Sequence, residues 1–319
     1  AGHSFVQVPA QDPPPWVVVP ATSGEVGKWM SGAADAISAE WERKGGAVLD
    51  AKQTSEHFEL RGSAPAPELS QNDIDRWVER SQAAVRYLAH GDYRGARREL
   101  QAAQRVADRA AAELNREAAR AQQVLDTCLY MVRAYVETGN RPAAKEQARE
   151  CRRLVPSVEP TAFRHTPEVR ELLSQVDREL AMGAPGMMEV LSEPSNCLVR
   201  VNGIAFGRTP VSDIELPVGS YRLQVECQES QRGRVQVLRV SSGVNRIVVD
   251  ARFEQTVHSR PLLYLEYEQP TEEAEYRMLD GRRVAETLGA RGVLVITRPE
   301  PSTLRIDLDG TARKPASVW

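Results

Sequence analysis

The stretch that most constrains the fold runs from residue 194 to residue 225. Apolar and polar residues alternate there on both sides of a glycine-containing turn, stop alternating at Thr209-Pro210, and alternate again after Gly219. A period of two places successive side chains on opposite faces of a strand, and glycine and proline mark the turns between strands. The stretch is therefore predicted to form three short strands joined by a turn and a loop.

Four short motifs in and beside this stretch carry a family resemblance. They are Ser-x-Pro (Ser192, Pro194), Val-x-x-Asn-Gly (Val199, Asn202, Gly203), Gly-x-Thr-Pro (Gly207, Thr209, Pro210) and Leu-Pro-x-Gly-x-Tyr (Leu216, Pro217, Gly219, Tyr221). With them the chain resembles the PEGA domain, a small β-sandwich module found on bacterial envelope proteins. Ser-Asn-Cys at 195–197 replaces the family's own Glu-Gly-Ala, as in a divergent member. The resemblance implies binding or display rather than catalysis. The loops at 202–209 and 217–220 both contain glycine and are expected to be able to approach another surface closely.

Length and charge bound the architecture and the partners. A chain of 319 residues exceeds what one hydrophobic core usually serves, so several domains are expected. The net charge of -3 creates no strong field toward nucleic acid or anionic lipid. No apolar run approaches the roughly 20 residues of a membrane-spanning helix. The chain begins with Ala1 rather than Met, which leaves open the removal of a signal peptide or a lipid anchor.

The four cysteines fall into two pairs. Cys197 enters the first predicted strand and Cys227 leaves the third, while Cys128 and Cys151 lie in consecutive predicted helices on either side of a turn at Gly139. Two disulfides with no cysteine left over favour an oxidising compartment, and with the PEGA resemblance this indicates the periplasm or the outer cell envelope. The alternative is four buried thiols acting as small hydrophobes. No CxxC or paired-histidine spacing favours a metal.

Residues 69–183 read as long helices dense in Ala, Arg, Glu and Leu. A sequence motif that begins Gly-Asp-Tyr-Arg-Gly-Ala at Gly91 recurs as Gly-Asn-Arg-Pro-Ala-Ala at Gly139. Each of these glycines is predicted to end a helix in the left-handed conformation. The segment resembles the tetratricopeptide repeat, whose helical hairpins stack through small residues. The glycines lie 48 residues apart, against about 34 in that repeat, and a long helix over 108–135 is expected to account for the difference. A plain helical bundle is the alternative.

A proline-rich break separates these helices from the next segment. Pro156 and Pro160 interrupt the pattern, and Pro167 begins a last helix before a PEGA-like module over 187–252. Helices, a proline-rich break and a PEGA module in this order resemble an arrangement common in myxobacterial envelope proteins.

The two ends of the chain are predicted to be α/β segments. Residues 1–15 are proline-rich and read as an extended tail. The 16–62 segment should contain strands at 16–20 and 47–49 around a helix over 26–41. The 258–319 segment should contain strands at 261–267, 292–297 and 303–308, and a helix over 272–288 interrupted at Asp280-Gly281. Each segment is short for a stable domain, so we expect both to complete one sheet, with two separate lobes as the alternative.

Motifs of catalysis do not occur in the sequence. It contains no GxGxxG, GxxxxGK[ST], GxSxG or HExxH. Glu56-His57 is expected to be an exposed pair in a loop, and Asp307-x-Asp309-Gly310 a turn at a strand end rather than a calcium loop. Acidic residues interleave with arginines through the helices, which is typical of a solvated surface and argues against nucleic-acid binding. We expect no catalytic residue, no cofactor and no metal.

These observations predict a multidomain α+β protein that is a non-enzymatic scaffold of a cell-envelope or surface assembly. Protein partners are expected in a helical groove, and the PEGA-like module is expected to contact a second partner, the cell-surface matrix or peptidoglycan. The alternative function is a ligand-binding or sensory protein with a small molecule between the terminal α/β segments. The candidate partner-contact residues are Asn202, Gly203, Phe206, Arg208, Tyr87, Tyr93 and Tyr130.

Overall fold

The computed structural model describes residues 14–161, 163–228, 232–310 and 313–318, the last range by its backbone alone. The predicted tail over 1–15 lies almost entirely outside these residues. The described chain mixes helices and strands, as expected, and divides into two compact units. We call Ala1–Ala64 together with Gln255–Trp319 the terminal unit and Pro65–Glu254 the central unit, and describe each by itself.

The terminal unit contains a mixed sheet to which both ends of the chain contribute. Its order is β10-β11-β1-β12-β13-β14, with β11, β1 and β12 parallel and the other pairs antiparallel. The bounds are β1 Trp16–Thr22, β10 Val257–His258, β11 Tyr264–Glu266, β12 Gly292–Glu300, β13 Thr303–Gly310 and β14 Arg313–Val318. Backbone pairing of β1 with β12 occupies the boundary between the two terminal segments, so a small molecule has no room between them along these strands.

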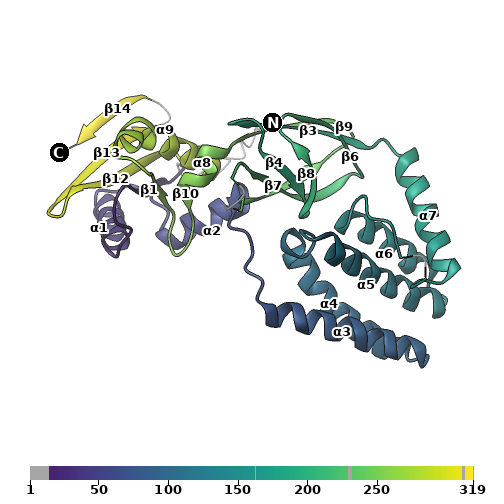
Figure 1. Ribbon diagram of the computed structural model, residues 1–319. Coiled ribbons are helices and arrows are strands. Elements are labelled where there is room, and N and C mark those ends of the chain that lie inside the picture. The colour runs from purple at the N-terminus through teal and green to yellow at the C-terminus, as the bar shows by residue number, and fades with distance from the viewer. Residues whose placement is uncertain (1–13, 162, 229–231, 311–312, 319) are drawn as a thin grey trace, which may run out of the picture. The chain divides into compact units, whose positions relative to one another are not determined.

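Helices cover both faces of this sheet (Figure 1). Val18 packs with Ala33 and Ala34 of α1 (Trp29–Arg43) on one face. The side chains of Val293 and Val295 point to the opposite face, where α9 (Pro270–Leu288) approaches so closely that a Cβ on Gly281 would lie 2.6 Å from Val295 Cγ2. Glycine is therefore required for packing inside α9, which runs unbroken through the interruption predicted there.

Residues 47–61 differ from the sequence prediction. Val48 forms only an isolated bridge to Trp16, so the predicted strand at 47–49 is wrong. The chain instead begins α2 (Ala51–Arg61) with a capping box between Asp50 and Gln53. Only Phe58 among the large apolar residues of α2 is buried, so the helical period was too weak to detect. Glu56-His57 accordingly lies on a helix rather than in a loop. Two short elements complete this part of the fold, β2 Ser63–Ala64 and α8 Ala251–Thr256, the latter containing the boundary between the units.

The central unit begins with two helical hairpins and a fifth helix. Their bounds are α3 Gln71–Ala89, α4 Tyr93–Leu114, α5 Ala118–Glu137, α6 Arg141–Leu154 and α7 Pro167–Met182. Gly91 and Gly139 each have φ +72°, and the side chains of Asp92 and Asn140 then cap the next helix in the same way. The predicted helix over 108–135 is wrong, because the chain turns at Asn115 between α4 and α5.

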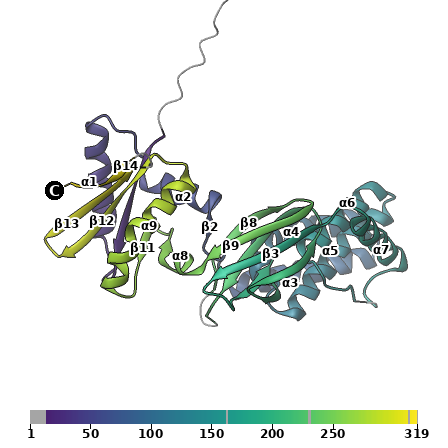
Figure 2. The same ribbon diagram turned by 90° about the horizontal axis from the view of Figure 1, so that it is seen from above.

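The second part of the central unit is a β-sandwich. One sheet contains β8, β7, β4 and β5 in that order, and the other has the order β6-β3-β9. The bounds are β3 Gly186–Glu193, β4 Leu198–Val201, β5 Ile204–Arg208, β6 Val211–Leu216, β7 Gly219–Glu226, β8 Val235–Val240 and β9 Gly243–Asp250. Alternate residues of both sheets, such as Met188, Val199 and Leu223, form the core between them. The sandwich lies along one side of the helices, as Figure 2 shows from above.

Both predicted disulfides are confirmed. Cys128 and Cys151 join α5 to α6 with an S–S distance of 2.08 Å, and Cys197 and Cys227 join the ends of neighbouring strands with a distance of 2.06 Å. Each half of the central unit therefore contains one covalent link.

Candidate functional site

The turn between β4 and β5 faces the helices. Asn202 and Gly203 take φ values of +49° and +88°, a conformation that suits Asn-Gly in a tight hairpin. Asn202 is only 3% exposed, and its Nδ2 donates to the carbonyl of Arg153 at 2.7 Å. A Cβ on Gly203 would lie 2.7 Å from the carbonyl oxygen of Ala112. The expectation that these two residues contact a partner is therefore corrected, because the surface that the turn approaches closely is formed by α4 and the end of α6 of the same chain.

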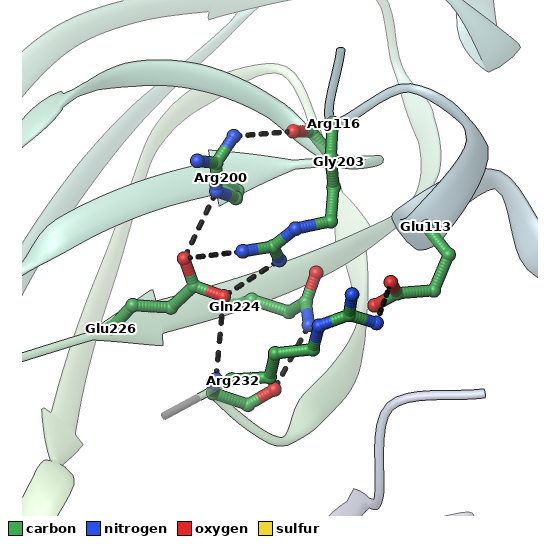
Figure 3. A network of polar contacts seen from close by, with 8 residues as sticks. Glu113, Arg116, Arg200, Gly203, Gln224, Glu226 and Arg232 are labelled. Atoms are coloured by element: carbon green, nitrogen blue, oxygen red, sulfur yellow. Dashed lines mark hydrogen bonds and ion pairs between the residues drawn. The ribbon is translucent and has the colours of Figure 1, made fainter. Parts of the chain in front are cut away.

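A charge cluster surrounds this turn (Figure 3). Arg116 donates to both carboxylate oxygens of Glu226, at 2.7 and 3.0 Å, and Nε of Arg200 donates to the same carboxylate at 3.0 Å. Glu113, at the end of α4, pairs with Arg232. Two arginines from different halves of the unit thus converge on one carboxylate of β7.

The two carboxylates of this cluster have pKa values shifted in opposite directions. Burial acts to raise the pKa of Glu226, but hydrogen bonds and charges from Arg116 and Arg200 outweigh it and lower that pKa. Burial raises the pKa of Glu113, and the charge of Arg232 offsets this only in part. Because the Glu226 carboxylate is enclosed by Arg116 and Arg200, the cluster is not an open binding site. It is a structural joint, by which we mean a polar contact that connects the helices to the sandwich.

The other predicted contact residues are scattered over the central unit. Phe206 packs against the sandwich core, and Arg208 is exposed with its Nη1 donating to the carbonyl of Asn196 at 2.8 Å. Tyr93 packs in the cluster between α3, α4 and α5. Tyr87 is exposed on α3, and Tyr130 lies on α5 beside a cavity. The structure does not bring these residues into one site.

The cavity beside Tyr130 is a candidate binding site. It measures about 270 Å³ and lies between α3, α5 and the loop before α7. Its apolar lining includes Val78 and Val85, and its polar lining includes Gln82 and Gln123. The full lining is Trp77, Val78, Ser81, Gln82, Val85, Gln123, Asp126, Thr127, Tyr130 and Arg164. We call this cavity and its rim the α3–α5 groove.

A buried aspartate fixes one end of the α3–α5 groove. His165 Nε2 contacts Asp126 Oδ1 at 2.8 Å, and Thr161 Oγ1 donates to Oδ2 at 3.0 Å. Gln122 Nε2 donates to Oδ1 at 3.3 Å, and Arg164 Nη1 donates to Oδ2 at 3.3 Å. The carboxylate therefore anchors the loop before α7 onto α5.

The Asp126 network also sets ionisation in the groove. Burial acts to raise the pKa of Asp126, but the hydrogen bond and charge of His165, with Thr161 and Gln122, lower it below its ordinary value. Burial and the nearby Asp126 carboxylate raise the pKa of the Tyr130 hydroxyl. Asp126 is therefore a stable anion and Tyr130 a neutral hydroxyl near neutral pH.

Sequence reasoning did not identify Asp126 or Arg164. Asp126 lies in an otherwise apolar run, Val124 to Leu129, in which only it and Thr127 are polar among core-facing positions. A carboxylate in the apolar face of a helix requires a partner, and that signal was available in the sequence. Arg164 had no comparable signal, because it lies in a loop whose path depends on tertiary contacts.

Comparisons with known proteins identify one part of the chain. Residues 186–229 match the PEGA domain, which confirms the resemblance seen in the sequence for this stretch. Neither the curated proteins nor the solved structures contain a significant match to the chain. A PEGA domain and two disulfides fit an extracytoplasmic protein.

Within residues 14–161, 163–228, 232–310 and 313–318, no helix has both the length and the apolar character that crossing a membrane requires. Across the same ranges, no cluster of three or more His, Cys, Asp or Glu side chains has an arrangement that would hold a metal ion.

Proposed function

We propose that the protein is a non-enzymatic adaptor of a bacterial cell-envelope assembly, and that the α3–α5 groove binds a linear segment of a partner protein. The observation that supports this most directly is the cavity between α3 and α5, which combines apolar walls with exposed amide and guanidinium groups. Such a mixture is typical of sites that take a side chain of a partner and fix its orientation by hydrogen bonds.

The arrangement of the helices supports the same proposal. The α3–α4 and α5–α6 hairpins turn at glycines of equal φ and begin their second helices with equivalent caps. We interpret them as tetratricopeptide-like repeats. The first helix of each hairpin then lines the groove, and α7 continues the row beside α5.

The PEGA module has two roles in this proposal. Its Asn202-Gly203 turn supports the helices from the side of α4 and α6, and its remaining exposed surface, including Arg208 and Val218, is available to a second partner or to the cell-surface matrix. The disulfides support a location in the periplasm or the outer envelope, where such bonds persist.

Site-specific photo-crosslinking in cells tests the adaptor proposal. A crosslinking amino acid replaces Val85 in the groove, and a matched variant carries it at Arg105, an exposed residue of α4 outside the groove lining. We expect a discrete crosslinked partner from position 85 and none from position 105. Equal crosslinking at both positions, or none at position 85, would count against the groove as a partner site.

A further inference from the structure

We infer that the α3–α5 groove selects a segment in which a carboxylate lies next to a large apolar side chain, the carboxylate on Arg164 and the apolar side chain in the cavity. This inference rests on the proposed function, because it names the chemistry of the partner that the groove binds. Some polar groups of the groove already have hydrogen-bond partners within the chain, whereas others are open to a ligand, and this difference indicates the chemistry of the ligand.

The acceptor capacity of the groove's one carboxylate is exhausted. An ionised carboxylate offers about four lone-pair sites. Asp126 already receives donors from His165, Gln122, Arg164, and from both the hydroxyl and the backbone N–H of Thr161. A cationic or donor-rich ligand therefore finds no open acceptor on Asp126.

Donor groups, in contrast, are available at the mouth of the cavity. The guanidinium of Arg164 has five N–H donors, and its side chain is 54% exposed although Nη1 contacts Asp126. Gln82 and Gln123 expose their amides on the facing helices. The indole N–H of Trp77, which also lines the cavity, has no hydrogen-bond partner within the described parts of the chain, but it is buried and adds no donor at the mouth. The glutamine amides can donate or accept, so the preference for an acceptor comes from Arg164, and a carboxylate is the acceptor that pairs best with arginine.

Apolar surface lies directly beside these donors. Val78 and Tyr130 form walls of the cavity, and Val85 at its rim is 39% exposed. Exposed aromatic and aliphatic side chains around a small cavity are typical of a partner-binding site rather than of free surface. The apolar half of the ligand is assigned to this cavity.

A peptide selection on the full chain tests this inference. A phage library of random 12-residue peptides is selected on the immobilised protein, and affinities of synthetic peptides are measured by fluorescence anisotropy. We expect enrichment of Asp or Glu within two positions of Leu, Ile or Phe. Replacing that acid by its amide, or Arg164→Gln, should weaken binding roughly tenfold, with partial retention in Arg164→Lys. Arg105→Gln on α4 is the matched control and should bind as the unaltered chain does.

The outcomes separate the inference from the proposed function. Peptides whose binding is lost in Val85→Asn, but which carry no acidic enrichment and bind Arg164→Gln equally well, would overturn the inference and leave the groove as a partner site. Absence of any peptide whose binding depends on Val85 would overturn both. Hydrogen exchange of α3 and α5 in each variant establishes that the groove is folded, so a loss of binding reports on contact rather than on unfolding.

Discussion

Asn115 Nδ2 donates to the backbone carbonyl of Asn202 at 3.0 Å, although the two residues lie 87 positions apart. The same amide donates to the carbonyl of Leu154 at the end of α6. One buried side chain therefore ties the α4–α5 turn to the last residue of α6 and to the tight turn of the PEGA module. The helices and the sandwich share a polar joint, and substitutions in that joint should affect both halves of the central unit.

Gly203→Ala should destabilise this joint. A Cβ there would lie 2.7 Å from the carbonyl oxygen of Ala112 and 2.9 Å from that of Ala111, both on the backbone, and the φ of +88° disfavours alanine. We expect a loss of about 2–4 kcal/mol in the free energy of unfolding, from conformational strain and overpacking together. Hydrogen exchange of the slowest amides in α4 and β7 measures it in the full chain.

Gly243→Ala is the matched control for this substitution. Gly243 has a similar φ of +85°, but no atom lies within 4 Å of the position of its Cβ. Its replacement by alanine should lower the free energy of unfolding by about 1 kcal/mol, because only the unfavourable backbone conformation contributes. Equal losses in the two variants would show that the Asn202-Gly203 turn does not press against α4.

Glu226→Gln should destabilise the central unit and reduce its pH dependence. The substitution leaves Arg116 and Arg200 without their shared counter-charge, which should cost about 3 kcal/mol near neutral pH. The folded-state pKa of Glu226 is lowered, so its contribution is present above the ordinary glutamate pKa and is lost as the pH falls through the lowered folded value. Stability measured by hydrogen exchange over acidic pH should therefore decline less steeply in the variant.

Glu146→Gln provides the comparison for that experiment. Glu146 pairs with Arg149 one turn along the same helix and is 63% exposed, so its loss should change stability by less than about 0.5 kcal/mol. A pH profile of Glu226→Gln that parallels the profile of the unaltered chain would contradict the assigned role of Glu226.

The sequence patterns that predicted correctly were local ones. Alternation and the turn motifs located the sandwich strands, and the repeated glycines at 91 and 139 located two helix ends. These features could be predicted because the period of a strand and the left-handed end of a helix depend on residues that are neighbours in the sequence. The break at Asn115 was not predicted, because Ala, Glu and Leu on its N-terminal side favour helix and the turn is stabilised by Leu154 and Asn202. For the same reason Asn202 was expected to contact a partner. Its burial depends on a helix that sequence patterns cannot place.

Removal of the Cys128–Cys151 disulfide should weaken the helical half of the unit. The bond closes a loop of 23 residues between α5 and α6, so Cys128→Ala with Cys151→Ala should lower the free energy of unfolding by about 3 kcal/mol. Mass spectrometry of non-reduced peptides should first show this pair linked, and Cys197 linked to Cys227. Free thiols at all four positions in protein purified from an oxidising compartment would contradict the extracytoplasmic assignment.

Asp126→Asn should loosen the loop before α7 and the groove with it. The amide keeps one acceptor oxygen but loses the charge that pairs with Arg164 and the second oxygen that receives Thr161 Oγ1. Because the position is buried, the expected loss is about 2–4 kcal/mol, and hydrogen exchange should rise first in residues 163–166. Acid should destabilise the unaltered chain in the same way. Because the pKa of Asp126 is lowered in the folded state, the stability that its carboxylate contributes is lost as the pH falls through that folded-state pKa.

Thr161→Val distinguishes the contribution of Asp126 to stability from its contribution to the position of Arg164. It removes one hydroxyl donor to Asp126 and keeps the shape of the side chain, so it should cost about 1 kcal/mol and leave the Arg164 contact in place. Peptide binding should then survive in Thr161→Val and fail in Asp126→Asn, since only the latter releases Arg164 from its position at the groove. Equal binding by both variants would mean that Asp126 stabilises the fold without placing Arg164.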